Sequence, residues 1–226
     1  ILTLVWAAML PALAAGDPNA AATVWEKSVV KVEVSRNLYD YYQPWNRRND
    51  RSAKIGLVAG QRQILTTAQD LSDRTLVRLQ RGGRGKWTNA KVEWVDYHAN
   101  LALLTTEDAA FWAGLHPANL SGKAPAEGDK LQIIRWREGK LENRQAEFTQ
   151  FAVRQSELSS ISHVQLELSS EIQGVGLGEP VVANSHVVGI VASQKGRTCK
   201  VIPASFIRTI LAARAAGNQR GLGYFH

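Results

Sequence analysis

The sequence predicts an all-β protein, built as barrels or a sandwich. Many short apolar runs recur along the 226 residues, and turn signals separate them, with 18 glycines in the chain. Convincing helical periodicity is confined to one late stretch, residues 205–216. The length suits one large or two small domains, and the 45% apolar and 21% charged content is ordinary for a globular protein.

The first half of the chain opens with a helix signal and continues in strands. Asp17 and Pro18 are typical of an N-cap and a first helical position, which predicts a short helix to about Lys27. Residues 36–51 are polar and aromatic, and we expect a loop there, long enough for a functional or partner contact. Strands are expected at 29–34, 54–59, 63–67, 75–80, 87–95 and 101–105, followed by a helical turn at 107–112.

The second half repeats this style and ends in a helix. Within residues 205–216, Phe206, Ile207, Ile210 and Leu211 share one face, and Gly217 is a suitable stop. The strands expected before it are 130–135, 144–153, 164–168, 181–183, 187–192 and 200–203.

The N-terminal segment, residues 1–15, is apolar and ends in small residues. It fits a secretory signal peptide clipped at its N-terminus, and it is too short for a comfortable membrane span. We therefore expect export to the periplasm or cell envelope and no membrane span. The alternative is a buried N-terminal helix.

The charge and the cysteine content limit the function classes. The net charge is +7, but the basic residues are scattered without interleaved aromatics, so we expect a solvated surface and no nucleic-acid partner. A binder of anionic surfaces stays an alternative. Cys199 stands alone, which excludes an internal disulfide and favours a buried strand thiol. The five histidines lack ligand spacing, so no metal site or cofactor is expected.

A glycine-rich turn, residues 174–180, precedes the last pair of apolar strands. Glycines at this density allow positive φ angles and a close approach of another group to the backbone. The turn reads Gly-Val-Gly-Leu-Gly-Glu-Pro, and none of these side chains is a nucleophile.

Several segments resemble, in order, the chymotrypsin-fold proteases of the HtrA/Deg type, closest to their Deg-like branch. Residues 64–71 (Ile-Leu-Thr-Thr-Ala-Gln-Asp-Leu) are similar to the family's Ile-Leu-Thr-Asn-Ala-His-Val-Val, and residues 100–104 (Asn-Leu-Ala-Leu-Leu) to its Asp-Leu-Ala-Leu-Leu. Residues 175–180 fall on Gly-Asn-Ser-Gly-Gly-Pro, and residues 201–205 on Ala-Ile-Pro-Ser. The resemblance covers about residues 24–223.

The resemblance implies two chymotrypsin-like Greek-key β-barrels, with a short N-terminal helix, a C-terminal helix and an active cleft between the barrels. We expect a signal peptide at 1–15, a trypsin-like protease-fold domain at 16–217 with barrels at about 24–108 and 126–203, and a linker or the start of a PDZ domain at 218–226.

The resemblance also implies that Gln69, Asn100 and Leu177 occupy the positions of the family's His, Asp and Ser. Leucine offers no nucleophile, glutamine exchanges no proton near neutral pH, and asparagine cannot stabilise an imidazolium as aspartate does. The oxyanion hole would use the backbone N–H groups of Val175 and Leu177, and a β-branched residue at 175 disfavours the angles that glycine allows. Glu179 replaces a second glycine and is expected to put a carboxylate near the cleft. No catalytic residue is therefore predicted to be intact.

These features predict a catalytically inactive pseudoprotease. The implied role is peptide or protein binding, or regulation of an active protease relative, in envelope protein quality control. The implied partners are peptides or unfolded protein segments, with a homo-trimer as the assembly. The alternative is an active serine endopeptidase with a mis-registered triad. Asp96, His98 and Ser185 are candidates for one, although nothing in the sequence brings them together and surface polar residues are expected instead.

Overall fold

The computed structural model describes residues 25–43, 45–171 and 174–217. The expected signal peptide, the helix start at Asp17 and Pro18, and the expected linker or PDZ start at 218–226 lie outside the described residues. No helix in the described ranges is long and apolar enough to cross a membrane.

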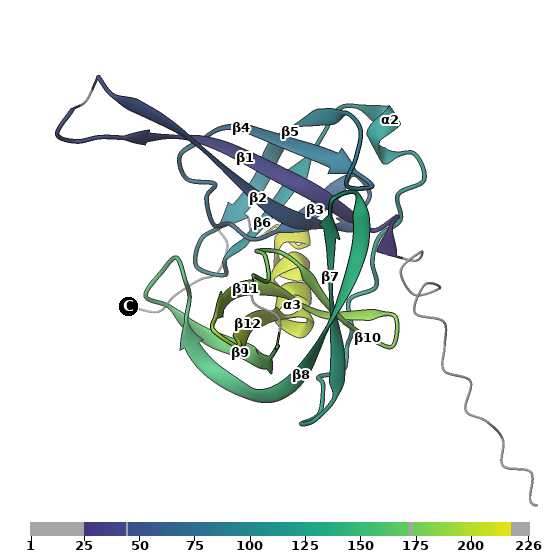
Figure 1. Ribbon diagram of the computed structural model, residues 1–226. Coiled ribbons are helices and arrows are strands. Elements are labelled where there is room, and N and C mark those ends of the chain that lie inside the picture. The colour runs from purple at the N-terminus through teal and green to yellow at the C-terminus, as the bar shows by residue number, and fades with distance from the viewer. Residues whose placement is uncertain (1–24, 44, 172–173, 218–226) are drawn as a thin grey trace, which may run out of the picture.

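The first barrel is a closed antiparallel sheet of six strands (Figure 1). Alternating valines on the first strand, Val30, Val32 and Val34, point into its core beside Leu79 and Leu104, as the two-residue period of a strand requires. In spatial order the strands are β1 (Val29–Tyr39), β2 (Arg47–Gly60), β3 (Gln63–Thr66), β6 (Leu101–Thr105), β5 (Trp87–Asp96) and β4 (Arg74–Arg81), and β4 pairs with β1 to close the sheet.

The second barrel repeats the arrangement. Its core contains Leu131, Ile133, Leu166 and Val201 together with Cys199, which is fully buried as expected. The strand order is β10 (Pro180–Ala183), β11 (His186–Lys195), β12 (Thr198–Pro203), β9 (Ser162–Ser169), β8 (Lys140–Gln155) and β7 (Lys130–Arg137), and β7 pairs with β10. The predicted all-β fold of two barrels is confirmed, and each barrel has six strands.

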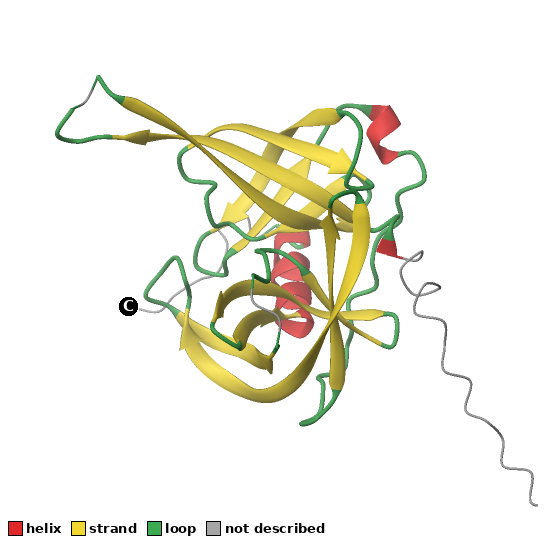
Figure 2. Cartoon of the chain, in the orientation of Figure 1, coloured by secondary structure: helices red, strands yellow, loops and turns green. Residues whose placement is uncertain are grey.

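Apolar contacts fix the two barrels against each other. Leu65 and Leu103 of the first barrel pack with Ile190 of the second and with Ile207 of α3 (Ala204–Ala215), the long helix in Figure 2. On another side of the interface, the indole N–H of Trp136 donates to the Val29 carbonyl oxygen at 2.7 Å. The groove between the barrels therefore has rigid walls.

Most predicted elements lie where the sequence places them, but the expected loop at 36–51 is wrong. There β1 and β2 continue as a long hairpin that projects from the first barrel (Figure 1), with Arg36 opposite Asp50 and Leu38 opposite Arg48. An ion pair of 2.7 Å joins Arg36 to Asp50. The two strands satisfy each other's backbone hydrogen bonds, so this segment stays extended without an apolar face to indicate it. The expected helical turn is α2 (Ala109–Trp112), capped by Asp108.

Candidate functional site

Gln69 and Asn100 lie together at one end of the first barrel. Gln69 follows β3 and Asn100 precedes β6, and these strands are neighbours with Thr66 opposite Ala102. The Gln69 backbone N–H donates to Asn100 Oδ1 at 3.3 Å. Asn100 is buried and has a φ of 53°, a left-handed conformation that asparagine adopts more readily than most residues. The pairing of β3 with β6 therefore brings two of the three expected triad positions into contact.

Asp96 holds the turn before Asn100. Its Oδ1 accepts hydrogen bonds from the backbone N–H groups of His98 (2.8 Å) and Ala99 (2.9 Å). The expectation that Asp96 is a surface residue is wrong, because its side chain is buried and caps this turn. Ser185 lies in the exposed turn between β10 and β11 of the other barrel.

Leu177 lies on a loop, residues 174–179, that leads into β10 of the second barrel and contacts β2 of the first. The Leu177 carbonyl oxygen accepts from the Ile55 N–H at 3.0 Å, and the Gly178 N–H donates to the Val191 oxygen at 2.8 Å. Gly178 has a φ of 74°, and a Cβ there would lie 2.2 Å from the Ile55 oxygen. The loop is thus docked on β2 and β11, and the hydroxyl of Thr66, three residues before Gln69, also bonds the Ile55 oxygen at 2.8 Å.

The expected oxyanion-hole donor at Val175 is already engaged. Its backbone N–H donates to Gln194 Oε1 at 2.7 Å, so a substrate oxygen would have to displace this side chain. The positive φ angles of the loop fall on Gly174 and Gly178, and Val175 is not among the residues with positive φ. Sequence reasoning missed Gln194, because nothing in its neighbourhood on β11 indicated a contact with a loop 19 residues earlier in the chain.

Lys54 is a second residue that the sequence reasoning missed. It is buried on β2, and its Nζ donates to the backbone oxygens of Thr67 (3.2 Å) and Gln69. Burial lowers the pKa of Lys54 to about 8. The available signal was a lysine at the start of the mainly apolar run expected as a strand at 54–59. Its amine holds the backbone of the segment that carries Gln69.

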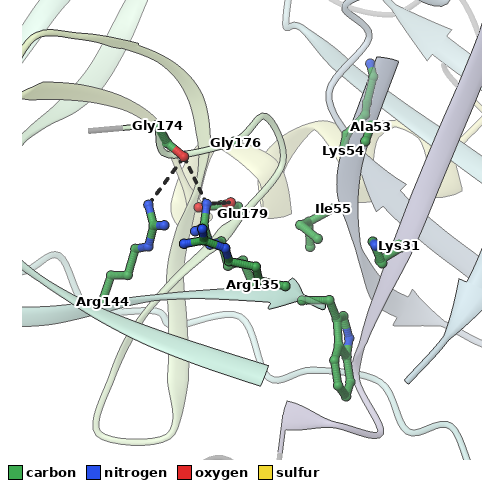
Figure 3. Close-up of a pocket in the computed structure, with 11 residues that line it drawn as sticks. Lys31, Ala53, Lys54, Ile55, Arg135, Arg144, Gly174, Gly176 and Glu179 are labelled. Carbon is green, nitrogen blue, oxygen red and sulfur yellow. Dashed lines mark hydrogen bonds and ion pairs between the residues drawn. The ribbon is translucent and has the colours of Figure 1, made fainter. Parts of the chain in front are cut away.

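Glu179 is buried against the loop. Its carboxylate accepts from the Gly176 N–H and lies 4.0 Å from Arg135 Nη1 (Figure 3). Burial raises the pKa of Glu179 to about 8. The Glu179 side chain therefore lines a cavity beside the loop.

The cleft has a binding edge but no reactive group at the three expected triad positions. Amide and alkyl side chains at Gln69, Asn100 and Leu177 neither attack a carbonyl nor shuttle a proton. Within the described ranges, no group of three His, Cys, Asp or Glu residues is placed to hold a metal ion. Strand β11 pairs with β10 only as far as Ile190, so beyond Val191 its edge beside the loop has no partner strand among the residues that the structure describes. That edge can accept an extended peptide.

The comparisons with known proteins agree with this arrangement. No family model matches the chain. It is similar to two Arabidopsis thaliana proteins, the putative protease Do-like 11, mitochondrial (27% identity, covering 73% of this chain and 30% of the relative), and the protease Do-like 4, mitochondrial (25%, covering 93% and 44%). The chain thus spans less than half the length of these relatives.

Solved protease structures share the fold. The active form of the Rv3671c protease from M. tuberculosis superposes with a TM-score of 0.69 at 17% identity, covering 100% of this chain and 97% of that one. The HtrA-type protease AlgWS227A with a decapeptide superposes with a TM-score of 0.71 at 12% identity, covering 88% and 68%. Two closed barrels and similarity to Do-like proteases along most of the sequence lead to one conclusion. The chain has the two-barrel fold of trypsin-like proteases, and its sequence resembles the proteases of the HtrA/Deg type.

Proposed function

We propose that this domain is a pseudoprotease, which binds extended peptide or unfolded protein segments without cleaving them. The observation that carries the proposal is the meeting of Gln69 with Asn100 through a 3.3 Å hydrogen bond, at the end of the barrel where the family resemblance expects a histidine and an aspartate. With Leu177 in the serine position, the site offers no nucleophile and no general base.

The geometry around the site supports the loss of catalysis. In a well-studied triad, changing aspartate to asparagine alone lowers turnover by about 10⁴-fold. Here the other two positions are changed as well, and the N–H of Val175 is bonded to Gln194. Oxyanion stabilisation needs donors that are aimed at the developing charge before reaction, and a donor satisfied by a side chain does not supply it.

Peptide binding is supported by the free edge of β11 beside the loop. An exposed strand edge presents unpaired N–H and C=O groups, and an extended peptide adds to such an edge by main-chain hydrogen bonds. The AlgWS227A structure, which shares this fold, contains a decapeptide. The finer assignments (a periplasmic or envelope location, protein quality control, regulation of an active relative, a homo-trimer and a following PDZ domain) belong to this proposal and rest on the family resemblance alone.

The first test is covalent labelling with a fluorophosphonate probe, with a casein cleavage assay alongside. We expect neither labelling nor cleavage for the wild-type chain, with an active HtrA-type protease as the positive control. Specific labelling of a serine in the native wild-type chain, abolished by unfolding, would refute the pseudoprotease and support the alternative of an active endopeptidase with another triad.

The second test measures binding of a fluorescein-labelled, reduced and alkylated protein by anisotropy. Leu177→Glu places a carboxylate in the cleft. Val153→Glu, the control, replaces an exposed apolar side chain of β8 with a carboxylate. We expect the Leu177 variant to bind about tenfold more weakly and the Val153 variant to bind as the wild type does, since a buried unpaired charge costs more than 1.4 kcal/mol. Equal affinity of both variants and wild type would place the binding surface elsewhere.

A further inference from the structure

A cavity of about 490 Å³ lies behind the loop, between the two barrels (Figure 3). Its walls come from β1 and β2 on one side, β7 and β8 on the other, and the loop itself. Its ionisable lining residues are five basic ones and one acidic one: Lys31, Lys54, Arg135, Arg137, Arg144 and Glu179.

The lining of the cavity includes none of the three expected triad positions and not the expected oxyanion-hole donor. Gly174 and Gly176 line the cavity, whereas Val175 and Leu177 do not. Gln69 and Asn100 are not part of its lining either.

The charges around the cavity do not balance within the protein. Arg135 and Arg144 both lie near the Glu142 carboxylate, at 3.0 and 3.8 Å, and Arg135 Nη1 is also 4.0 Å from Glu179 Oε1. Lys31 has no ion-pair partner in the described part of the chain, and burial keeps Glu179 protonated near neutral pH by raising its pKa to about 8. Arg137 is matched by Glu138 at 3.8 Å, and the amine of Lys54 is turned away toward backbone oxygens. Positive charge is therefore in excess.

A buried polar atom in the lining also has no partner. Glu179 Oε2 makes no hydrogen bond, although the side chain is only 3% exposed. Buried polar atoms are nearly always hydrogen-bonded, so an orphan of this kind indicates a missing partner. A protonated carboxyl donates a hydrogen bond, and the matching partner is an acceptor.

We propose that this cavity binds a small oxyanion, a phosphate or carboxylate group, between Lys31, Arg135 and Arg144 with the Glu179 carboxyl as a further donor. The planar guanidinium group carries donors in a fork that matches two oxygens of such an anion. The ammonium of Lys31 supplies a point charge from the opposite barrel.

Binding here is coupled to the loop through one peptide group. The Gly174 carbonyl oxygen accepts from Arg135 Nη1 at 3.0 Å and from Arg144 Nη1 at 3.3 Å. The N–H of the same planar peptide belongs to Val175 and is held by Gln194 on the cleft side. An anion that draws the arginines away frees this peptide to rotate, so the cavity controls the orientation of the expected oxyanion-hole donor.

The proposal is tested by titrating the full chain with inorganic phosphate and, separately, with acetate by calorimetry at pH 7 and constant ionic strength. We expect saturable 1:1 binding that Lys31→Gln weakens about tenfold, as for loss of a charge-assisted hydrogen bond. Arg135→Lys keeps the charge and loses the fork, and it should weaken binding as well. Lys91→Gln, which removes an exposed charge on β5, is the matched control and should bind as wild type does.

The anion that binds more tightly, phosphate or acetate, shows whether the site prefers a phosphate or a carboxylate group. Absence of saturable binding, or an equal loss in the Lys91 control, would overturn the site. The Val175 amide resonance provides a local readout, and we expect it to shift on saturation in the wild type but not in Lys31→Gln. A saturated protein with an unchanged Val175 amide would overturn the coupling.

A pH series with sulfate, whose charge is constant from pH 6.5 to 9, tests the role of Glu179. The groups that face its carboxyl are Arg135 and Gly176 N–H, with Glu142, Arg144 and Cys199 around them. Wild-type affinity should fall as Glu179 loses its proton, whereas Glu179→Gln should keep its affinity to pH 9. An equal fall in sulfate affinity in the wild type and in Glu179→Gln would show that Glu179 does not contribute to the site.

Discussion

Replacing Gly178 by alanine tests how closely the loop is docked on the first barrel. Gly178 has a φ of 74°, and an added Cβ would lie 2.2 Å from the Ile55 oxygen and 3.0 Å from Thr66 Oγ1. Gly174 provides the matched control, because its φ is 78° but its Cβ would meet nothing within 4 Å. The two substitutions share the backbone cost and differ only in the clash.

The expected loss of stability is the sum of the backbone cost, the steric clash and the hydrogen bond that the clash breaks. A left-handed alanine costs about 1–2 kcal/mol, which is the whole effect expected for Gly174→Ala. At Gly178, overpacking against fixed backbone adds about 1–3 kcal/mol. Loss of the Leu177 oxygen to Ile55 N–H bond adds about 1 kcal/mol more. We therefore expect about 3–6 kcal/mol of destabilisation for Gly178→Ala.

Thermal unfolding followed by tryptophan fluorescence measures both variants against wild type. The two variants differ by about 2–4 kcal/mol, so at about 2–4 °C per kcal/mol for a chain of this size their melting temperatures should differ by roughly 4–16 °C. Equal destabilisation of the two variants would show that the loop is not seated against Ile55 and would undermine the geometry from which the site is derived.

Two further predictions concern buried ionisable groups. The pKa of Glu179 is raised to about 8, so the folded state retains a proton that the unfolded state releases above about 4.5, and this contribution to stability is lost as pH rises from about 4.5 through 8. Glu179→Gln should remove that part of the pH dependence in urea unfolding series, and an unchanged slope would show that Glu179 titrates normally. Burial raises the pKa of Cys199 to about 11, so a thiol reagent at pH 8 should react with it only after unfolding; rapid reaction of the native chain would contradict its place in the core.

The strands were predictable because their apolar residues alternate and the pattern is local. Val30, Val32 and Val34 mark β1 by their spacing alone, and Leu101–Thr105 has the bounds that the sequence predicts. The hairpin beyond Arg36 was not predictable in this way. Its residues face solvent on both sides, and only pairing with the opposite strand keeps them extended.

The site was predictable in its positions and not in its contacts. Motif order placed Gln69, Asn100 and Leu177 at the expected triad positions, and that assignment stays a prediction. The sequence did not predict which side chains hold the surrounding backbone, because each of them bonds a partner far along the chain. Gln194 reaches Val175, and Lys54 reaches Thr67.

By itself, the sequence determined the β architecture, the family resemblance and the absence of nucleophile and base at the three expected triad positions, since these depend on local pattern and on residue identity. Only the tertiary structure decided where basic side chains gather around one cavity and which backbone groups of the loop are hydrogen-bonded to side chains. Arg135 and Arg144 come from neighbouring strands, yet they meet the carbonyl of Gly174 only after the second barrel closes. Burial then raises the pKa of Glu179, and no sequence pattern indicates that this residue is buried.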